Sequence, residues 1–336
     1  MVMNLVRRCN IEVIYKNKDI TEKLTPYLQS VTVVDNLEGV FDSLEIKLLN
    51  KNNLFMGKGW SFQKGDLLKI TATTLNWENE YEGEKRFNLG EFYIDEKEFD
   101  KYTARIKAIS APLNATDTTH DKTWENIQLK SLGQEIANKY KLKYQFLSDD
   151  INFSNLQQER QTDFQFLKNT AEESDVKVKI TNEKLVLFDE SKLPDKIKKH
   201  IQVDLLKVID FKLRDTKKNT YDSVELSHFD VIKLKDVTYV KSYNELKGLP
   251  GGTTNKVLKL KKRPSTQNIE KYAIAQIEKA NRTSTVLEIT DIGNGSMYSG
   301  CVIEVLNSGE FNGKYLVKKI TKTFPQFKMV VEAYKL

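Results

Sequence analysis

The sequence feature that most constrains the fold is an internal repeat, in which residues 211–226 match residues 31–46 without a gap at an offset of 180 residues. The first copy reads VTVVDNLEGVFDSLEI and the second reads FKLRDTKKNTYDSVEL. In each copy, apolar residues alternate with polar ones on both sides of a central polar stretch, which is the period of a strand with one buried face. Each copy therefore predicts two strands joined by a polar turn.

Three further pairs of segments follow in the same order in both halves of the chain. They are residues 65–70 with 300–305, residues 90–94 with 313–317, and residues 106–109 with 331–334. In the first two pairs a glycine precedes the alternating run, which suits a turn that needs positive φ before a strand. The repeat predicts two similar antiparallel β-barrels, at about residues 1–111 and 202–336, because closing a sheet protects its edges.

The residues between the two copies have a different pattern. Ser131 with Gln134, and Thr162 with Gln165, have the spacing of a helix capping box, and apolar residues at helical spacing follow each pair. Two apolar runs, at residues 176–180 and 185–188, then predict a hairpin. We therefore expect a mainly β protein with a small α+β domain inserted at residues 112–201, ending in a linker near residues 193–196.

The second barrel is expected to carry an insertion at about residues 230–298. Within it, the stretch NELKGLPGGTTN at residues 244–255 predicts a loop, and apolar residues at helical spacing from Ile269 to Ala280 predict a short helix. The basic run KVLKLKKR at residues 256–263 alternates with apolar residues, which predicts an edge strand or a wet interface. It has no interleaved aromatic residues on which nucleic-acid bases could stack.

Composition excludes few functions but favours a soluble chain. Lys and Arg number 53 and Asp and Glu number 47, a mild excess that requires neither nucleic acid nor an anionic membrane as partner. No run of apolar residues is long enough to span a bilayer, and the N-terminus lacks the pattern of a secretory signal. Cys9 and Cys301 lie near opposite ends, and a disulfide between them stays open.

The sequence predicts no metal site, no cofactor site and no catalytic site. His120, His200 and His228 each lack a second ligand two to four residues away, and the cysteines form no C-x-x-C pair. Residues 250–252 are glycine-rich but predict a plain loop rather than a phosphate-binding turn. The adjacent carboxylates, Asp149 with Asp150 and Glu172 with Glu173, are best explained by solvation in a loop and at a helix end.

Several segments together resemble a known family. The segments are residues 42–46, 64–70 and 90–96 in the first half, residues 123–124, 131–133, 136–137, 162–164 and 166–167 in the middle, and residues 309–317 near the end. Their order resembles the late control protein D family of contractile-tail phages, and also the front portion of valine-glycine repeat protein G in type VI secretion. The chain departs from that pattern in the stretch at about 230–268 and in having no spike-like β-helix at its C-terminal end, which favours a separate spike subunit.

The resemblance implies a non-enzymatic structural subunit: a baseplate hub with two tail-tube-like barrels that forms a homotrimer. Two barrels per chain in a trimer give six similar barrels, which can match a six-fold tail tube on one side and a three-fold spike on the other. The implied partners are tail tube or tube-initiator subunits and a central spike protein, with tape measure protein and baseplate wedge subunits as further candidates. The implied location is the bacterial cytoplasm during assembly and then the baseplate of a phage tail or tail-like particle.

Two other functions stay open. One is a tail-associated peptidoglycan-degrading enzyme with its active site in the α+β insert, because a sugar-cleaving enzyme needs two carboxyl groups and the insert contains both adjacent pairs. The other is a carbohydrate- or nucleic-acid-binding module. The parent particle, whether a phage, a headless tail-like bacteriocin or a secretion system, also stays open.

Overall fold

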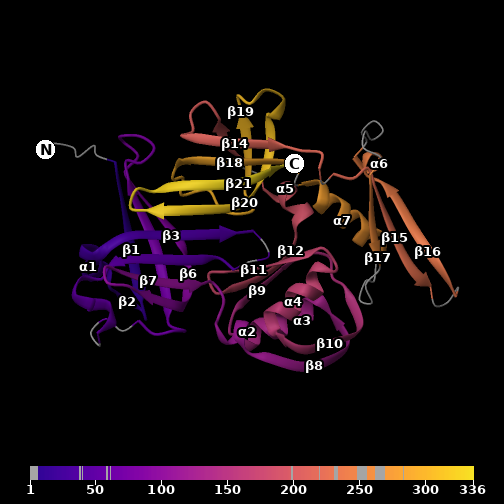
Figure 1. Ribbon diagram of the computed structural model, residues 1–336, viewed down its shortest axis with the longest axis horizontal. Coiled ribbons are helices and arrows are strands. Elements are labelled where there is room, and N and C mark those ends of the chain that lie inside the picture. The colour runs from indigo at the N-terminus through magenta and orange to yellow at the C-terminus, as the bar shows by residue number, and fades with distance from the viewer. Residues whose placement is uncertain are drawn as a thin grey trace.

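The computed structural model describes residues 7–37, 39, 41–57, 60, 62–197, 200–218, 220–230, 234–247, 256–261, 269–282 and 284–336. Within these residues the fold is mainly β, as predicted, and one large sheet has 13 strands (Figure 1). The strands of the first half are β1 (Arg8–Tyr15), β2 (Lys18–Asp19), β3 (Leu28–Asn36), β4 (Ser43–Leu49), β5 (Leu67–Leu75), β6 (Glu84–Phe99) and β7 (Thr103–Ile109), with a short helix α1 (Thr21–Leu24).

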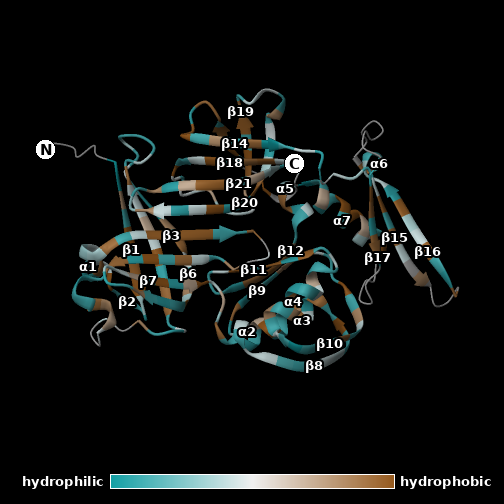
Figure 2. Ribbon diagram, viewed as in Figure 1, coloured by the Kyte–Doolittle hydropathy of each residue, from teal (hydrophilic) through white to brown (hydrophobic). Residues whose placement is uncertain are grey.

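Alternation of apolar and polar residues builds the first half. Every second residue of β4, β5 and β7 is buried, and Figure 2 shows hydrophobic residues alternating with hydrophilic ones along the strands of the large sheet. Burial of apolar surface on one face is the main favourable free energy of such a sheet. Its core includes Val31, Val33, Leu44, Ile46, Leu68, Ile70, Ile94, Ile106 and Ala108.

The second half repeats the strand order of the first. Its strands are β13 (Ile201–Asp204), β14 (Asp210–Asp215), β18 (Thr285–Ile292), β19 (Val302–Leu306), β20 (Gly313–Phe324) and β21 (Lys328–Lys335). The first half pairs in the order β3-β4-β7-β6-β5-β1, and the second in the order β14-β18-β21-β20-β19-β13. One difference is that β13 runs parallel to β19, whereas β1 runs antiparallel to β5.

The strand register in the two halves agrees with the three later pairs of segments that the sequence repeat aligned. Ile94 faces Ala108 and Val317 faces Ala333, and a bulge follows directly in both strand pairs. The N–H of Gly65 donates to the carbonyl of Ile94 at 2.7 Å, and the equivalent bond from Gly300 to Val317 is also 2.7 Å long. These segments were therefore aligned correctly from the sequence alone.

The sixteen-residue match is correct for one of its two strands. Register places Val33 at the position of Leu213, so β3 and β14 correspond at the 180-residue offset. However, β15 (Ser223–Asp230) pairs with β16 and β17 rather than with β14, and β18 takes the place equivalent to β4. The tripeptide Leu-Glu-Ile, at residues 44–46 and 287–289, is the sequence signal for this equivalence. The alignment missed it because residues 216–284 intervene.

The strand pairings do not close either half into a barrel within the described residues. No pairing joins β1 to β3, or β13 to β14. In the first half the reason is that the edge of β3 needed for closure pairs instead with β20. The two halves therefore form one continuous sheet, and the expectation of two separate closed barrels is not met by these pairings.

The insert between the halves is a separate α+β layer, drawn at the bottom of Figure 1. Its elements are α2 (Asn114–Asp117), β8 (Thr119–Gln128), α3 (Leu129–Lys139), β9 (Lys143–Leu147), β10 (Asn152–Thr162), α4 (Asp163–Glu172), β11 (Val176–Thr181), β12 (Lys184–Asp189) and α5 (Leu193–Lys196). The predicted hairpin is confirmed, because β11 pairs antiparallel with β12. The insert has its own core, in which Trp124 stacks on Phe166 at 5.1 Å between ring centroids.

The two predicted caps of the insert have different outcomes. Thr162 is the N-cap of α4, and its hydroxyl accepts the N–H of Gln165 as the capping box requires. Ser131 is not a cap, because α3 begins two residues earlier, at Leu129. There the carboxylate of Asp150, which lies in a loop 20 residues further along the chain, accepts the N–H of Lys130 and so caps the helix.

A third unit lies at the right of Figure 1 and interrupts the second half. It consists of β15, β16 (Lys235–Ser242), α6 (Tyr243–Lys247), β17 (Val257–Lys261) and α7 (Ile269–Arg282). The predicted helix is α7, and the predicted edge strand is β17, which lies at the border of a three-stranded sheet. Residues 244–247 of the predicted loop belong to α6, and residues 248–255 lie outside the described residues, as do residues 262–263 of the basic run.

Candidate assembly surface

The junction between the two halves is a strand pairing. Residues 319–324 of β20 pair antiparallel with β3, from Lys319 opposite Asn36 to Phe324 opposite Val31. Main-chain pairing of this kind joins two sheets without an edge between them. The junction therefore makes the two halves one continuous sheet.

Aromatic side chains reinforce this junction. The turn between β20 and β21 places Phe324 and Phe327 in the core of the first half, with their rings stacked at 4.7 Å. Trp77 lies 5.2 Å from the Phe327 ring and donates its indole N–H to the carbonyl of Gly293 at 2.7 Å. Buried aromatic contacts contribute large apolar area, so this turn stabilises the junction strongly.

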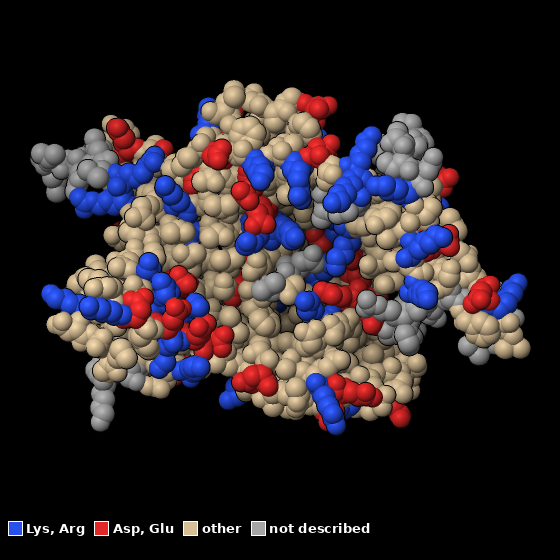
Figure 3. Space-filling view, viewed as in Figure 1, with Lys and Arg blue, Asp and Glu red and all other residues tan. Residues whose placement is uncertain are grey.

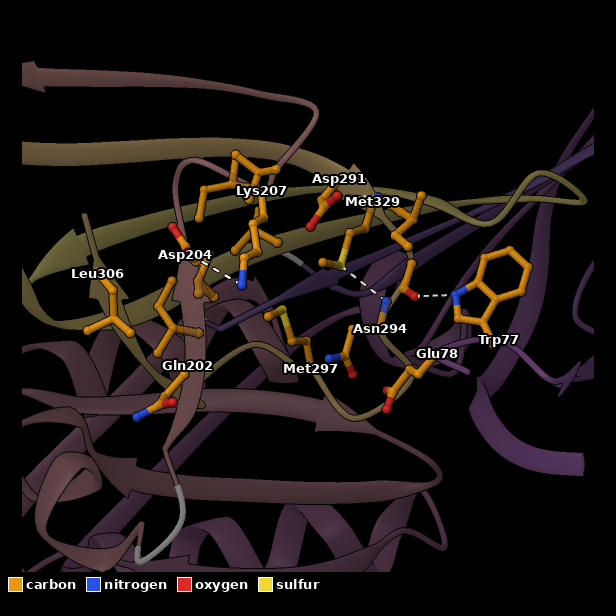
Figure 4. Close-up of a pocket in the computed structure, with 17 residues that line it drawn as sticks. Trp77, Glu78, Gln202, Asp204, Lys207, Asp291, Asn294, Met297, Leu306 and Met329 are labelled. Carbon is orange, nitrogen blue, oxygen red and sulfur yellow. Dashed lines mark hydrogen bonds and ion pairs between the residues drawn. The ribbon is translucent and has the colours of Figure 1, made fainter. Parts of the chain in front are cut away.

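A pocket of about 430 Å³ lies beside the junction, at the open side of the second half (Figure 4). Trp77 and Glu78 line it from the first half, and the rest of its wall comes from β13, β18, β19, β21 and the loops after β13 and β18. In Figure 4 Asp204 and Lys207 point toward one another, and their charged groups are 3.6 Å apart. The carboxylates of Glu78, Asp204 and Asp291 line the pocket together with Lys207, and we interpret it as the mouth of the second half.

A buried lysine ties the insert to both halves. The Lys179 ammonium on β11 lies 2.7 Å from a carboxylate oxygen of Asp35 and 2.8 Å from one of Asp42, and it donates to the Ser299 hydroxyl at 3.2 Å. The backbone N–H of Ser299 also donates to Asp35, at 2.8 Å. Because removal of one partner would leave buried charge unpaired, this cluster fixes the position of the insert.

The two carboxyl groups around Lys179 have opposite pKa shifts. Burial raises the pKa of Asp42 to about 6, against the attraction of Lys179 and with the repulsion of Asp35. Burial acts in the same sense on Asp35, but the Lys179 charge and hydrogen bonds outweigh it and hold the pKa of Asp35 below its usual range. The cluster thus has one firmly ionised carboxylate and one that takes up a proton first as pH falls.

Strand β14 forms one exposed end of the large sheet, at the top of Figure 1. Of its six residues only Leu213 is half-buried, and the others are exposed. Three apolar side chains on and just before it are exposed: Leu206 by 79%, Ile209 by 57% and Phe211 by 46%. An exposed strand edge with apolar side chains is a typical protein-interaction surface.

A second exposed surface, at the end of β6 and on β7 in the first half, is rich in charged residues. Glu96 and Glu98 alternate along the end of β6 and Asp100 directly follows it. Arg105 and Lys107 of β7 lie beside them, with 2.8 Å between Arg105 and Glu98. Figure 3 shows charged side chains of both signs gathered on this part of the molecule. Together with β14, this surface is the candidate assembly surface.

The histidines and cysteines are spread over the fold. His120 lies on β8, His200 directly before β13 and His228 on β15, so they belong to three different parts of the fold. Cys9 and Cys301 are both free, so the disulfide left open by the sequence does not form. In the described part of the chain no group of three or more His, Cys, Asp or Glu side chains could hold a metal ion.

The adjacent carboxylates lie where the sequence predicted. Asp149 and Asp150 are in a loop, where Asp149 forms an ion pair with Lys192 at 2.8 Å. Glu172 is the last residue of α4 and Glu173 is its C-cap. The pocket on the insert is lined by Gly39, Phe41, Thr116, Thr162, Phe164, Gln165, Lys168, Val178 and Ile180, so it contains none of the four carboxylates.

Solved structures match nearly the whole chain, although no family model and no curated protein matches its sequence. The 43 kDa tail protein of prophage MuSo2 from Shewanella oneidensis has a TM-score of 0.73 and 13% identity, over 97% of this chain and 98% of that chain. A tail protein from Neisseria meningitidis has a TM-score of 0.72 and 9% identity, over 98% and 97% of the two chains.

An Escherichia coli protein described as a type VI secretion component matches more distantly. Its TM-score is 0.57 with 10% identity, over 92% of this chain and 74% of that chain. The fold is therefore that of phage tail proteins, a class that extends to type VI secretion. The resemblance to tail hub proteins seen in the sequence is confirmed at the level of the fold.

No helix among the described residues is both long and apolar enough to cross a bilayer.

Proposed function

We propose that the chain is a non-enzymatic structural subunit of a contractile tail or injection machine, and that it acts as a baseplate hub. The observation that carries the proposal is the strand order repeated in both halves of one continuous sheet. A chain that presents the same unit twice can make six similar contacts as a trimer, so it can adapt a six-fold tube to a three-fold spike.

The fold supports this proposal independently. The chain spans almost the full length of two phage tail proteins and has their fold. The E. coli relative is described as resembling bacteriophage tail proteins as well as belonging to type VI secretion. These descriptions favour assembly as the function. From the sequence resemblance we propose tail tube or tube-initiator subunits and a central spike as the main partners, and tape measure and wedge subunits as further ones.

We propose the division of the chain into residues 1–111, 112–201 and 202–336, with the insertion at about 230–298. Distinct hydrophobic cores for the first half, the insert and the second half favour it. The unit of β15 to α7 has its own small core as well. The particle would assemble in the bacterial cytoplasm and then carry the chain in its baseplate.

The decisive measurement is the molar mass of the purified protein by light scattering, alone and together with the proteins encoded beside its gene. We expect a trimer, either alone or once a spike partner is present. A chain that stays monomeric in both conditions would overturn the hub proposal.

The peptidoglycan-degrading alternative has its own test. Clearing of a turbid cell-wall suspension by the wild-type protein, and not by Glu172→Gln or Glu173→Gln variants, would support it. A structural subunit predicts no clearing with any of the three proteins. Salt-dependent binding to DNA or to polysaccharide would favour the binding-module alternative instead.

A further inference from the structure

The junction inside the chain gives a template for contacts between chains. Its β3 edge belongs to the first half, and its β20 edge, residues 319–324, belongs to the second half. In the repeated strand order β3 corresponds to β14, and β20 corresponds to β6. Applying the same relation once more would join β14 of one chain to β6 of a second chain.

Both of these edges are open in the described part of the chain. Strand β14 pairs with β18 on one side only. Strand β6 pairs with β7 through Phe99, but β5 accompanies its other edge only as far as Tyr93. Residues 96–99 of β6 thus have the same free edge that the equivalent residues of β20 use for β3.

We propose that β14 of one copy pairs antiparallel with residues 96–100 of a second copy, in the register of the internal junction. This inference rests on the proposed function, because it specifies how copies of the hub meet. The equivalence of Ile94 with Val317 places Glu96 at the position of Lys319 and Phe99 at that of Lys322. The register of β14 follows from the 180-residue offset.

The transferred register brings opposite charges together. Arg214 lies opposite Glu98, and Lys212 lies opposite Asp100, all four on one face of the paired strands. On the other face Asp215 lies opposite Lys97. In all three pairs in which both residues are charged the signs are opposite, and cross-strand pairs of opposite charge favour pairing.

Apolar residues match in the same register. Leu213 lies opposite Phe99, and both are half-buried in the single chain. Tyr102, in the turn before β7, corresponds to Phe327 in the turn before β21. Phe327 is fully buried at the internal junction, whereas Tyr102 is 65% exposed. The transferred register places Tyr102 of the second copy at the exposed cluster around Ile209 and Phe211 of the first copy.

The charged pairs would determine which strand binds and in which register, and would contribute less to the affinity. Glu98 already lies 2.8 Å from Arg105 and 3.5 Å from Lys107, so Arg214 would extend an existing network of exposed ion pairs. Such pairs contribute little energy in water, but they discriminate between partners. The affinity would come from main-chain hydrogen bonds and from Tyr102 and Phe211, which the contact would bury.

The same charges disfavour pairing of β14 with itself. An antiparallel β14 dimer centred on Leu213 would place Lys212 directly opposite Arg214, and like charges opposite one another are unfavourable. The contact is therefore heterologous, with different surfaces on the two copies. Heterologous contacts that close form rings.

Charge reversal with restoration tests the register. The Arg214→Glu variant and the Glu98→Lys variant should each weaken self-association ~10-fold or more in sedimentation velocity. The chain that carries both changes should recover the wild-type state, because the pair is restored with reversed sign. Asp100 is left unchanged because its carboxylate accepts the N–H groups of Tyr102 and Thr103 in the turn before β7. Lys235→Glu/Lys259→Glu, exposed on β16 and β17, is the matched control and should associate as wild type.

A cysteine pair tests the same contact directly. In a Cys9→Ser background, Glu98→Cys/Arg214→Cys should give covalent dimers and trimers on a non-reducing gel, and Glu98→Cys/Lys235→Cys should not. If wild-type copies associate but neither the reversals nor the cysteine pair has an effect, this interface is wrong while the hub proposal stands. If wild-type copies never associate, alone or with neighbouring proteins, both fail.

Discussion

Lys179 shows how a single side chain can hold three parts of this chain together. It lies on β11 of the insert, its carboxylate partners Asp35 and Asp42 belong to the first half, and Ser299 belongs to the second. Burial of the cluster makes the ionised carboxylates costly unless the lysine neutralises them. Burial raises the pKa of Asp42 to about 6, and the neighbouring Asp35 charge acts in the same sense, so Asp42 takes up a proton in mildly acidic solution.

The free energy of unfolding should therefore depend on Asp42 in a pH-specific way. The pKa of Asp42 is about 6 in the fold, above its value in the unfolded chain, so the folded protein binds the extra proton. The stability that this proton contributes is complete below about pH 4 and is lost as pH rises through about 6. In urea titrations, the stability of Asp42→Asn relative to wild type should rise by up to roughly 3 kcal/mol between pH 4 and pH 7.

Ser110→Ala is the control for this measurement. Its hydroxyl accepts the backbone N–H of Asp42 at 3.1 Å, so its loss removes a contact of the same residue but no titrating group. The stability difference between this variant and wild type should be nearly constant over the same pH range. Parallel profiles for Asp42→Asn and wild type would contradict the assigned pKa.

At the scale of the element, the two glycines that open corresponding segments share a backbone conformation but differ in surroundings. Gly90 has φ of +138° and Gly313 has φ of +135°, a region that other residues rarely adopt. A Cβ at Gly90 would lie 2.6 Å from the ring of Phe92, which is buried, whereas one at Gly313 would lie 3.8 Å from the flexible end of Lys335. A side chain at either glycine would therefore meet the same backbone strain, but only a side chain at Gly90 would also collide with a buried ring.

Alanine substitution should separate strain from packing. Gly313→Ala is expected to lower the free energy of unfolding by about 1–3 kcal/mol through backbone strain alone. Gly90→Ala should cost clearly more, because Phe92 must also move out of its buried position. Urea unfolding of the two variants gives the comparison, and equal losses would show that the Phe92 contact is relieved without cost.

At the scale of the whole molecule, the junction of β3 with β20 makes two similar halves into one sheet. The turn that contains Phe324 and Phe327 belongs by sequence to the second half but packs in the core of the first. The stability of both halves therefore depends on a contact between them. A rigid relation between the halves is also what a ring of several copies needs.

Phe327→Ala should reveal how strongly the halves depend on this contact. Truncating the fully buried ring leaves a cavity against Trp77 and Phe324, so we expect a loss of about 3–5 kcal/mol in urea unfolding. Phe229→Ala is the matched control, because its ring is 57% exposed and its loss should change stability by less than about 0.5 kcal/mol. A similar small effect for both variants would show that the halves are stable independently.

Local patterns in the sequence determined the fold class and most elements. Alternation of apolar residues gave β3, β14 and the later strands, and the Thr162 cap and the hairpin of β11 with β12 were readable because their partners lie a few residues apart. The correspondence of Ala108 with Ala333 followed from order and spacing alone. These features depend on short-range chemistry, which a single sequence carries.

Only the tertiary structure decided how the repeated strands join. The sequence placed β15 next to β14, but a long intervening unit let β18 take that edge. It also could not show that β20 pairs with β3, or that Lys179 meets Asp35 and Asp42 across more than 130 positions of the chain. Pairing between distant strands depends on which edges and buried charges meet once the chain is compact, and periodicity within a strand carries no information about its neighbour.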